Sequence, residues 1–147
     1  MIRQTIGMTL LWLLPTIVLA QGVPATPKGP EAGTRTHVQN YKDMVLATCI
    51  ATAYKNDHGA SMDAGSSVSA LRDWTAYDLE KAPSATSTLV RGYLARDYRN
   101  PLAEDEAPGV RFDLLKCLDL YHSKALDDQA KALVIDPGQT SRDDRGK

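Results

Sequence analysis

The sequence has 147 residues, of which 43% are hydrophobic, 24% charged and 6% aromatic, and this composition fits one globular domain. Seventeen lysines and arginines against eighteen aspartates and glutamates give a formal net charge of -1. This charge argues against general binding to nucleic acid or to anionic lipid. With two cysteines and three separated histidines, we expect no zinc site and no cofactor.

Residues 1–20 have the pattern of a secretory signal peptide. Arg3 precedes an apolar run over residues 6–20 that ends in the triplet Val18-Leu19-Ala20. The run is shorter than the roughly 20 residues of a transmembrane helix, and Pro15 interrupts it. We therefore predict export with cleavage after about Ala20 and no membrane attachment afterwards; an uncleaved anchor is the alternative.

Residues 21–35 contain three prolines and three glycines and few residues that could be buried, so they predict a flexible linker. A first helix over about 38–56 follows. Thr36 and Gln39 have the spacing of a capping box, in which two side chains satisfy free backbone donors at a helix start.

Three further helical patterns follow in chain order. A helix over about 66–81 would bury Trp74, Thr75 and Leu79, and one over about 85–98 comes after Pro83. A fourth pattern starts at Phe112 and reaches Leu126, and residues 126–134 extend it or form a short last helix. Its apolar positions are Leu114, Leu115, Leu118 and Tyr121.

The chain thus predicts an all-α fold. No segment shows sustained alternation with period two, so we expect a single small bundle of four to five helices in residues 36–135. Residues 136–147 are polar and predict a disordered tail.

Residues 99–110 form a long loop between the third and fourth helices. They contain two prolines, a glycine and an acidic triplet, which disfavour regular structure. Long loops in compact domains are often functional, and an acidic tip suits insertion into a basic or donor-rich cleft. A plain solvated connection is the alternative.

Cys49 and Cys117 are 68 residues apart, each on the apolar face of a predicted helix. After export, a disulfide that ties the first helix to the fourth is expected. Two buried free thiols are one alternative, and a cysteine nucleophile is another. His122 is a poor partner for Cys117, because five residues on a helix turn by about 140°.

Two other groups could carry chemistry. His58 with Asp63 offers metal donors in one loop, and Trp74 with Tyr77 offers an aromatic platform. Turn formation explains the first group and core packing the second. We therefore expect no catalytic residue and no metal site.

Four blocks, in this order, resemble the type VI secretion amidase immunity proteins of family four, over about residues 36–134. The blocks are Asn40-Tyr41-Lys42-Asp43, Leu46-Ala47-Thr48-Cys49-Ile50-Ala51, Trp74-Thr75-Ala76-Tyr77-Asp78 and Leu114-Leu115-Lys116-Cys117-Leu118-Asp119-Leu120-Tyr121. The resemblance implies a periplasmic, all-helical protein that protects a Gram-negative cell from an injected peptidoglycan amidase. It also implies a homodimer that binds and does not catalyse.

The resemblance further implies which residues act. The cognate toxin would be a cysteine amidase that cuts between D-glutamate and meso-diaminopimelate, and a loop of the immunity protein would enter its cleft. Cys49 and Cys117 would form the disulfide, and the loop would correspond to residues 99–110. Its predicted contact residues are Asn100, Leu102, Glu104, Asp105 and Glu106. The alternative function is a periplasmic enzyme or small-ligand carrier that uses the surroundings of His58/Asp63 or Trp74/Tyr77.

Overall fold

The computed structural model describes residues 29–146, apart from the side chains of Ala103 and Glu104. The predicted signal peptide lies outside these residues. The described elements are η1 (Glu31–Thr34), α1 (His37–Ala53), α2 (His58–Arg72), α3 (Ala82–Leu94), α4 (Pro101–Glu106), α5 (Asp113–Tyr121), α6 (Lys124–Leu133) and α7 (Ser141–Asp144). The all-α prediction is confirmed: five of these helices form the bundle, and the described part contains only two isolated β-bridges.

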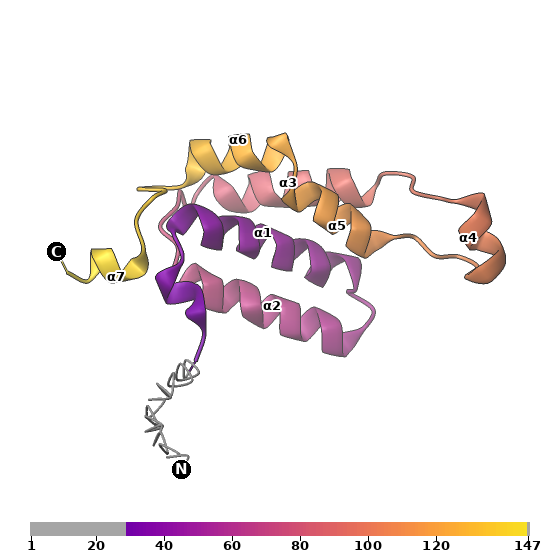
Figure 1. The fold of residues 1–147 in the computed structure, drawn as a ribbon, viewed down its shortest axis with the longest axis horizontal. Helices are drawn as coiled ribbons and strands as arrows, with labels where there is room; N and C mark the ends of the chain where they lie inside the picture. Colours follow the sequence, from indigo (N-terminus) through magenta and orange to yellow (C-terminus); the bar gives the residue numbers. More distant parts are fainter. Residues whose placement is uncertain (1–28, 147) are drawn as a thin grey trace, which may run out of the picture.

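Helix α1 is the central element, because it contacts α2, α3, α5 and α6 (Figure 1). Its buried stripe includes Tyr41, Val45 and Cys49, at the spacing of one helix face. Cys49 is bonded to Cys117 of α5, so the predicted disulfide is confirmed and joins two helices far apart in sequence. In the described part of the chain, no helix has the length and apolar character needed to cross a membrane.

The start of α1 confirms the predicted capping box. The backbone N–H of Gln39 donates to Thr36 Oγ1 at 3.3 Å, and the N–H of Thr36 donates to Gln39 Oε1 at 3.0 Å. The helix therefore begins at His37, one residue before the predicted start.

The second helix begins and ends earlier than predicted. Asp57 accepts a hydrogen bond from the N–H of Ala60 at 3.0 Å and so caps α2, whereas the sequence favoured a start near Ser66. After α2, Tyr77 pairs with Val134 in a β-bridge, and Leu79 is 66% exposed. Residues 74–79 therefore form part of an irregular connection between α2 and α3, and not the end of a helix.

The third helix also begins earlier than predicted. Pro83 lies in the first turn of α3, where a missing N–H costs nothing, and does not separate two helices. Helix α3 ends at Leu94, which makes the connection to α5 longer than the sequence indicated.

Within the predicted tail, residues 137–146 are folded against the bundle, contrary to the prediction. Thr140 bridges Thr36, and the carbonyl of Gln139 accepts a hydrogen bond from the N–H of His37 at 2.8 Å. The buried ring of His37 contacts Asp144 through Nε2 at 2.9 Å. The tail folds because it supplies acceptors to donors at the start of α1 that would otherwise be unsatisfied.

The predicted linker also has regular structure at its end. Residues 31–34 form η1, and the carbonyl of Ala32 accepts a hydrogen bond from Asn40 Nδ2 at 2.8 Å. The side chain of Ala32 is buried, so the folded domain begins before residue 36.

Candidate partner-binding site

The connection from α3 to α5, residues 95–112, extends away from the bundle and carries α4 at its far end (Figure 1). We call this segment the protruding loop. It includes all of residues 99–110, in which no regular structure was expected. That expectation was wrong for Pro101–Glu106, which form the six residues of α4.

The start of α4 has a local cause. Asn100 Oδ1 accepts a hydrogen bond from the N–H of Leu102 at 3.1 Å, and Pro101 occupies the first helical position. An asparagine cap followed by proline favours a helix start. The pair Asn100-Pro101 was therefore a signal for a helix start, although the prolines of residues 99–110 led us to expect no regular structure there.

The predicted contact residues lie together at the tip. Leu102 is 80% exposed, and Asp105 and Glu106 are exposed on the same short helix. Glu104 lies in α4, but its side chain is outside the described part. The tip therefore presents an apolar residue beside carboxylates, a combination that suits a cleft with both apolar and donor groups.

Two residues redirect the chain as it returns to the bundle. Gly109 has φ 76°, and Phe112, which precedes α5, has φ 53°. Left-handed backbone is common for glycine and rare for a bulky residue such as phenylalanine. The returning arm thus has left-handed backbone at two positions, one within it and one directly before α5.

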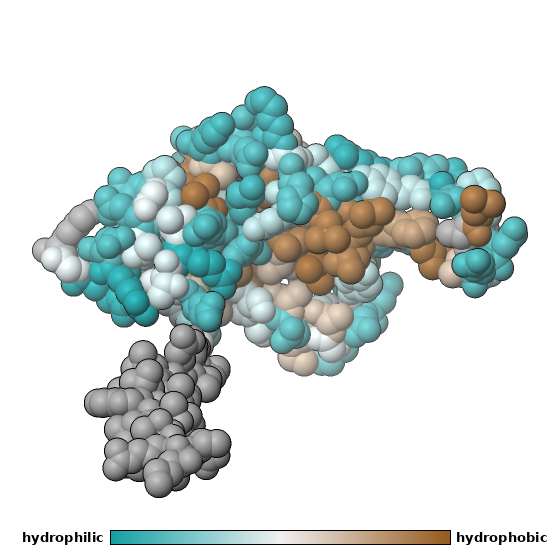
Figure 2. All heavy atoms as spheres, viewed as in Figure 1, coloured by the Kyte–Doolittle hydropathy of each residue, from teal (hydrophilic) through white to brown (hydrophobic). Residues whose placement is uncertain are grey.

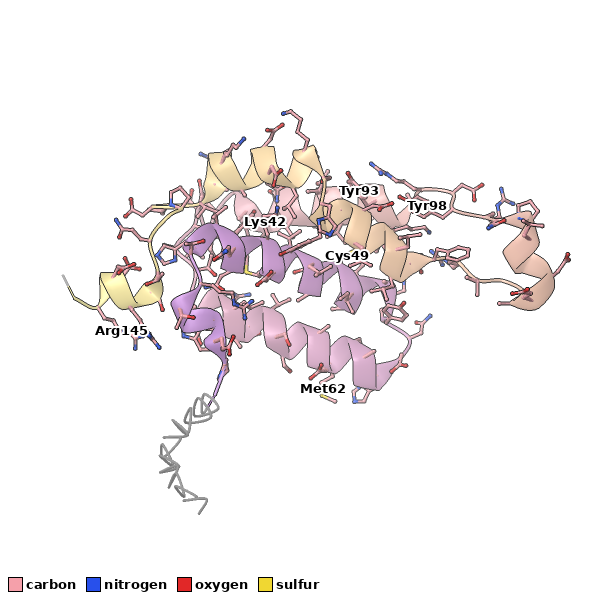
Figure 3. The ribbon with its side chains drawn as sticks, viewed as in Figure 1. Lys42, Cys49, Met62, Tyr93, Tyr98 and Arg145 are labelled. Carbon is pink, nitrogen blue, oxygen red and sulfur yellow. A yellow bond between two sulfur atoms is a disulfide. The ribbon has the colours of Figure 1, made fainter. Side chains whose placement is uncertain are left out.

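Polar contacts hold the base of the loop. The phenol of Tyr98 donates to Asp119 Oδ2 of α5 at 2.5 Å, and Figure 3 labels Tyr98 where the chain leaves the bundle. This hydrogen bond to a carboxylate raises the pKa of Tyr98. Arg99 donates to both carboxylate oxygens of Asp97 and lowers the pKa of Asp97 to about 2.

A buried lysine also lies at this base. Lys116 of α5 is only 3% exposed, and its ammonium donates to Asp113 Oδ1 at 2.9 Å and to the carbonyl of Leu94 at 3.2 Å. Lys116 was not among the predicted site residues. A lysine directly beside a buried cysteine, within an apolar helix pattern, was the available signal.

An apolar surface adjoins the loop. Leu114 and Leu115 are each 47% exposed and Leu118 is 39% exposed, and with Tyr54 and Val110 they line a shallow hollow of about 510 Å³. Figure 2 shows apolar side chains on this face, continuing toward the protruding loop. We call these five residues the leucine face.

The leucine face corrects a prediction. Leu114, Leu115 and Leu118 were expected among the apolar positions of their helix together with Cys117, but α5 buries Lys116, Cys117 and Leu120 and leaves these three leucines exposed. The disulfide turns the Cys117 side of α5 toward α1, so the three leucines point away from the core.

The residues of the alternative function are not assembled into one site. His58 and Asp63 are exposed on α2, and residues 29–146 contain no group of three or more side chains that could hold a metal ion. Tyr77 packs near Tyr41 and lines an open groove of about 440 Å³ between α1, α2 and α3, but Trp74 does not line that groove. The two aromatic residues therefore do not form a shared platform.

Comparisons with known proteins agree with this geometry. Residues 39–130 match the family Tai4, described as type VI secretion system (T6SS) amidase immunity protein. A comparison with curated proteins gave no match.

One solved structure is similar over most of the fold. It comes from work on new type VI-secreted toxins and self-resistance proteins in Serratia marcescens. Its TM-score is 0.71 at 27% sequence identity, covering 86% of this chain and 100% of that one. Since the family match covers more than half of the sequence, the chain belongs to the type VI secretion system amidase immunity protein family.

Proposed function

We propose that this immunity protein acts in the periplasm by binding its cognate amidase effector and placing the tip of the protruding loop in the catalytic cleft. The observation that carries the proposal is the position of α4, which stands clear of the bundle with Leu102 80% exposed. An apolar side chain held that far into solvent contributes nothing to the protein's own core and is available to a partner.

The tip alone is too small for a tight complex. A stable interface buries about 800 Å² on each partner, and α4 has only six residues. The leucine face lies beside the returning arm of the loop and offers the apolar area that the tip lacks. We infer that the amidase contacts both, with the loop in its cleft and the leucine face against the rim.

The proposed action is binding and not catalysis. The chain has two cysteines, and both are consumed by the Cys49–Cys117 disulfide, so neither is a nucleophile in this state. In the proposed complex the reactive cysteine belongs to the amidase, which the family resemblance describes as a cysteine enzyme.

The first test is rescue. Candidate type VI secreted amidases directed to the periplasm should lyse cells, and co-expression of the full chain should prevent lysis by the cognate enzyme. A chain without residues 1–20 should fail to protect. Rescue that persists without those residues would contradict the periplasmic site of action.

The second test targets the tip. With the amidase identified by rescue, Leu102→Asp should weaken binding at least about tenfold, or about 1.4 kcal/mol, measured by calorimetry. Met62→Asp is the matched control, because Met62 is also an exposed apolar residue, but on α2 (Figure 3). Equal affinities for wild type and Leu102→Asp would remove the tip from the mechanism.

The acidic residues need a separate test. Replacing Asp105 and Glu106 with Ala should lower the rate of association more than it raises the rate of dissociation, since exposed charges act mainly by steering. The control replaces Asp63 and Glu80, which are exposed carboxylates elsewhere on the chain. An association rate that is unchanged by the tip variant would contradict a role for these charges.

We also propose that the chain forms a homodimer, as the resemblance implies. If two copies met through the leucine face, the amidase could not occupy that face as inferred above. Leu115→Glu with Leu118→Glu decides between the two uses of this face. Sedimentation equilibrium should show monomers if it joins two copies, whereas calorimetry should show weaker amidase binding if it joins the effector. A variant that changes neither quantity would exclude the leucine face from both.

A further inference from the structure

The ammonium group of Lys116 connects the two ends of the protruding loop. The loop leaves the bundle after Leu94, whose carbonyl accepts from Lys116 Nζ at 3.2 Å. It returns at Asp113, whose Oδ1 accepts from the same nitrogen at 2.9 Å. One buried cation therefore binds the last residue of α3 and the first residue of α5.

The surroundings make this contact strong. The side chain of Lys116 is 4% exposed, and that of Asp113 is 13% exposed, so solvent screens their attraction only weakly. The carbonyl of Leu94 lies in the last turn of α3, where the helix dipole favours a cation. The ammonium also lies 5.8 Å from the ring centroid of Tyr98, a residue of the outgoing arm.

Lys116 is itself fixed in place. The next residue, Cys117, is bonded to Cys49 of α1, so the backbone that carries the lysine belongs to the rigid part of the molecule. Asp113 has a second partner in Arg111, at 3.4 Å, on the returning arm. The contacts thus run from the disulfide through Lys116 to both arms.

We propose that Lys116 is a positioning residue, which holds both arms of the protruding loop against the disulfide-tied bundle so that α4 points in one direction before the amidase arrives. This inference rests on the function proposed above. Its energetic role is to lower the conformational entropy that the loop loses on binding.

The test begins with the free protein. Spin labels at positions 105 and 62, attached through unnatural side chains, report the distance from α4 to α2. Wild type should give one narrow distance distribution, and Lys116→Met should broaden it at least twofold. Lys124→Met is the matched control, because it removes an exposed lysine paired with Asp128 on α6 and should leave the width unchanged. Equal widths for wild type and Lys116→Met would overturn the proposal.

The second measurement uses the cognate amidase. Lys116→Met should weaken binding about tenfold, and its effect should not add to that of Leu102→Asp, because both changes act through the tip. A role in stability alone predicts additive losses of affinity, and that result would overturn the positioning role. If Lys116→Met does not fold, Asp113→Asn removes the same ion pair at the rim of the bundle and is subject to the same two criteria.

The two proposals fail differently. If wild type and Leu102→Asp bind the amidase equally, the proposed function of the tip is wrong, yet the distance distributions still show whether Lys116 orders the loop. If Leu102→Asp weakens binding and Lys116→Met does not, the tip acts as proposed and the role of Lys116 is refuted.

Discussion

The bundle and the protruding loop are stabilised by different interactions, although α5 belongs to both. On the bundle side, α5 buries Cys117 and Leu120 against α1 and is joined to it by a disulfide. On the loop side, few side chains are buried, and the contacts are hydrogen bonds and ion pairs gathered at the base. Burial and a covalent bond fix the scaffold, whereas a small number of directed polar contacts fix the loop.

A large effect on stability should come from loss of the disulfide. Closing a loop of 68 residues stabilises the folded state by about 4 kcal/mol in the chain-entropy model. Replacing Cys49 and Cys117 together with Ala should lower the free energy of unfolding by about this amount in urea titrations. The wild-type protein, kept reduced in excess dithiol, should behave in the same way. A loss below about 1 kcal/mol would show that packing alone holds α1 to α5.

The two faces of α5 should respond differently to the same substitution. Leu120→Ala removes a fully buried side chain and should cost about 2–5 kcal/mol, because a cavity remains. Leu115→Ala, on the exposed face, should change stability by less than about 0.5 kcal/mol. Thermal unfolding of both variants checks this. Similar losses would mean that the leucine face is packed in solution.

A smaller effect on stability is expected from a substitution in the returning arm of the loop. Gly109 has φ 76°, and an alanine there should cost about 1–2 kcal/mol in backbone strain, although nothing lies within 4 Å of the added methyl group. Because the loop contributes little to the core, Gly109→Ala should reduce the free energy of amidase binding by more than it reduces the free energy of unfolding. Gly92→Ala, in open space on α3, is the control and should stabilise slightly. A melting temperature that falls in Gly109→Ala with unchanged binding would contradict the separation of the two regions.

The smallest effect concerns pH. Hydrogen bonds from Arg99 lower the pKa of Asp97 from 3.8 to about 2. Since the folded-state pKa is the lower one, the ion pair contributes fully above about pH 4 and is lost as pH falls through about 2. Carboxyl signals of Asp97 in NMR should titrate near pH 2 in wild type and closer to 3.8 in Arg99→Gln. A wild-type midpoint near 3.8 would show that the pair does not form in solution.

The sequence was sufficient for the fold class and for the disulfide. Apolar positions in α1 recur with helical spacing, and both cysteines fall on such stripes, so these features follow from local patterns. The capping box of Thr36 and Gln39 is equally local, and the structure has it as expected.

Other features depend on contacts between distant segments. The tail is ordered because Gln139 and Asp144 meet His37 at the start of α1, and no pattern within residues 136–147 indicates that partner. Leu115 and Leu118 are apolar at helical spacing, yet they are exposed because the disulfide sets the rotation of α5. Lys116 was overlooked for the same reason: its acceptors come from α3 and from the other end of the loop.

The folded tail also determines where the protein can be immobilised or fused without covering its binding site. Helix α7 contacts η1, and both lie at the opposite end of the bundle from α4 (Figure 1). Coupling to a surface or a fluorophore, or fusion to a second protein domain, beyond α7 would therefore take place far from the tip. An array of such fusions would present every α4 outward, so the chain offers a ready geometry for capturing its amidase from solution.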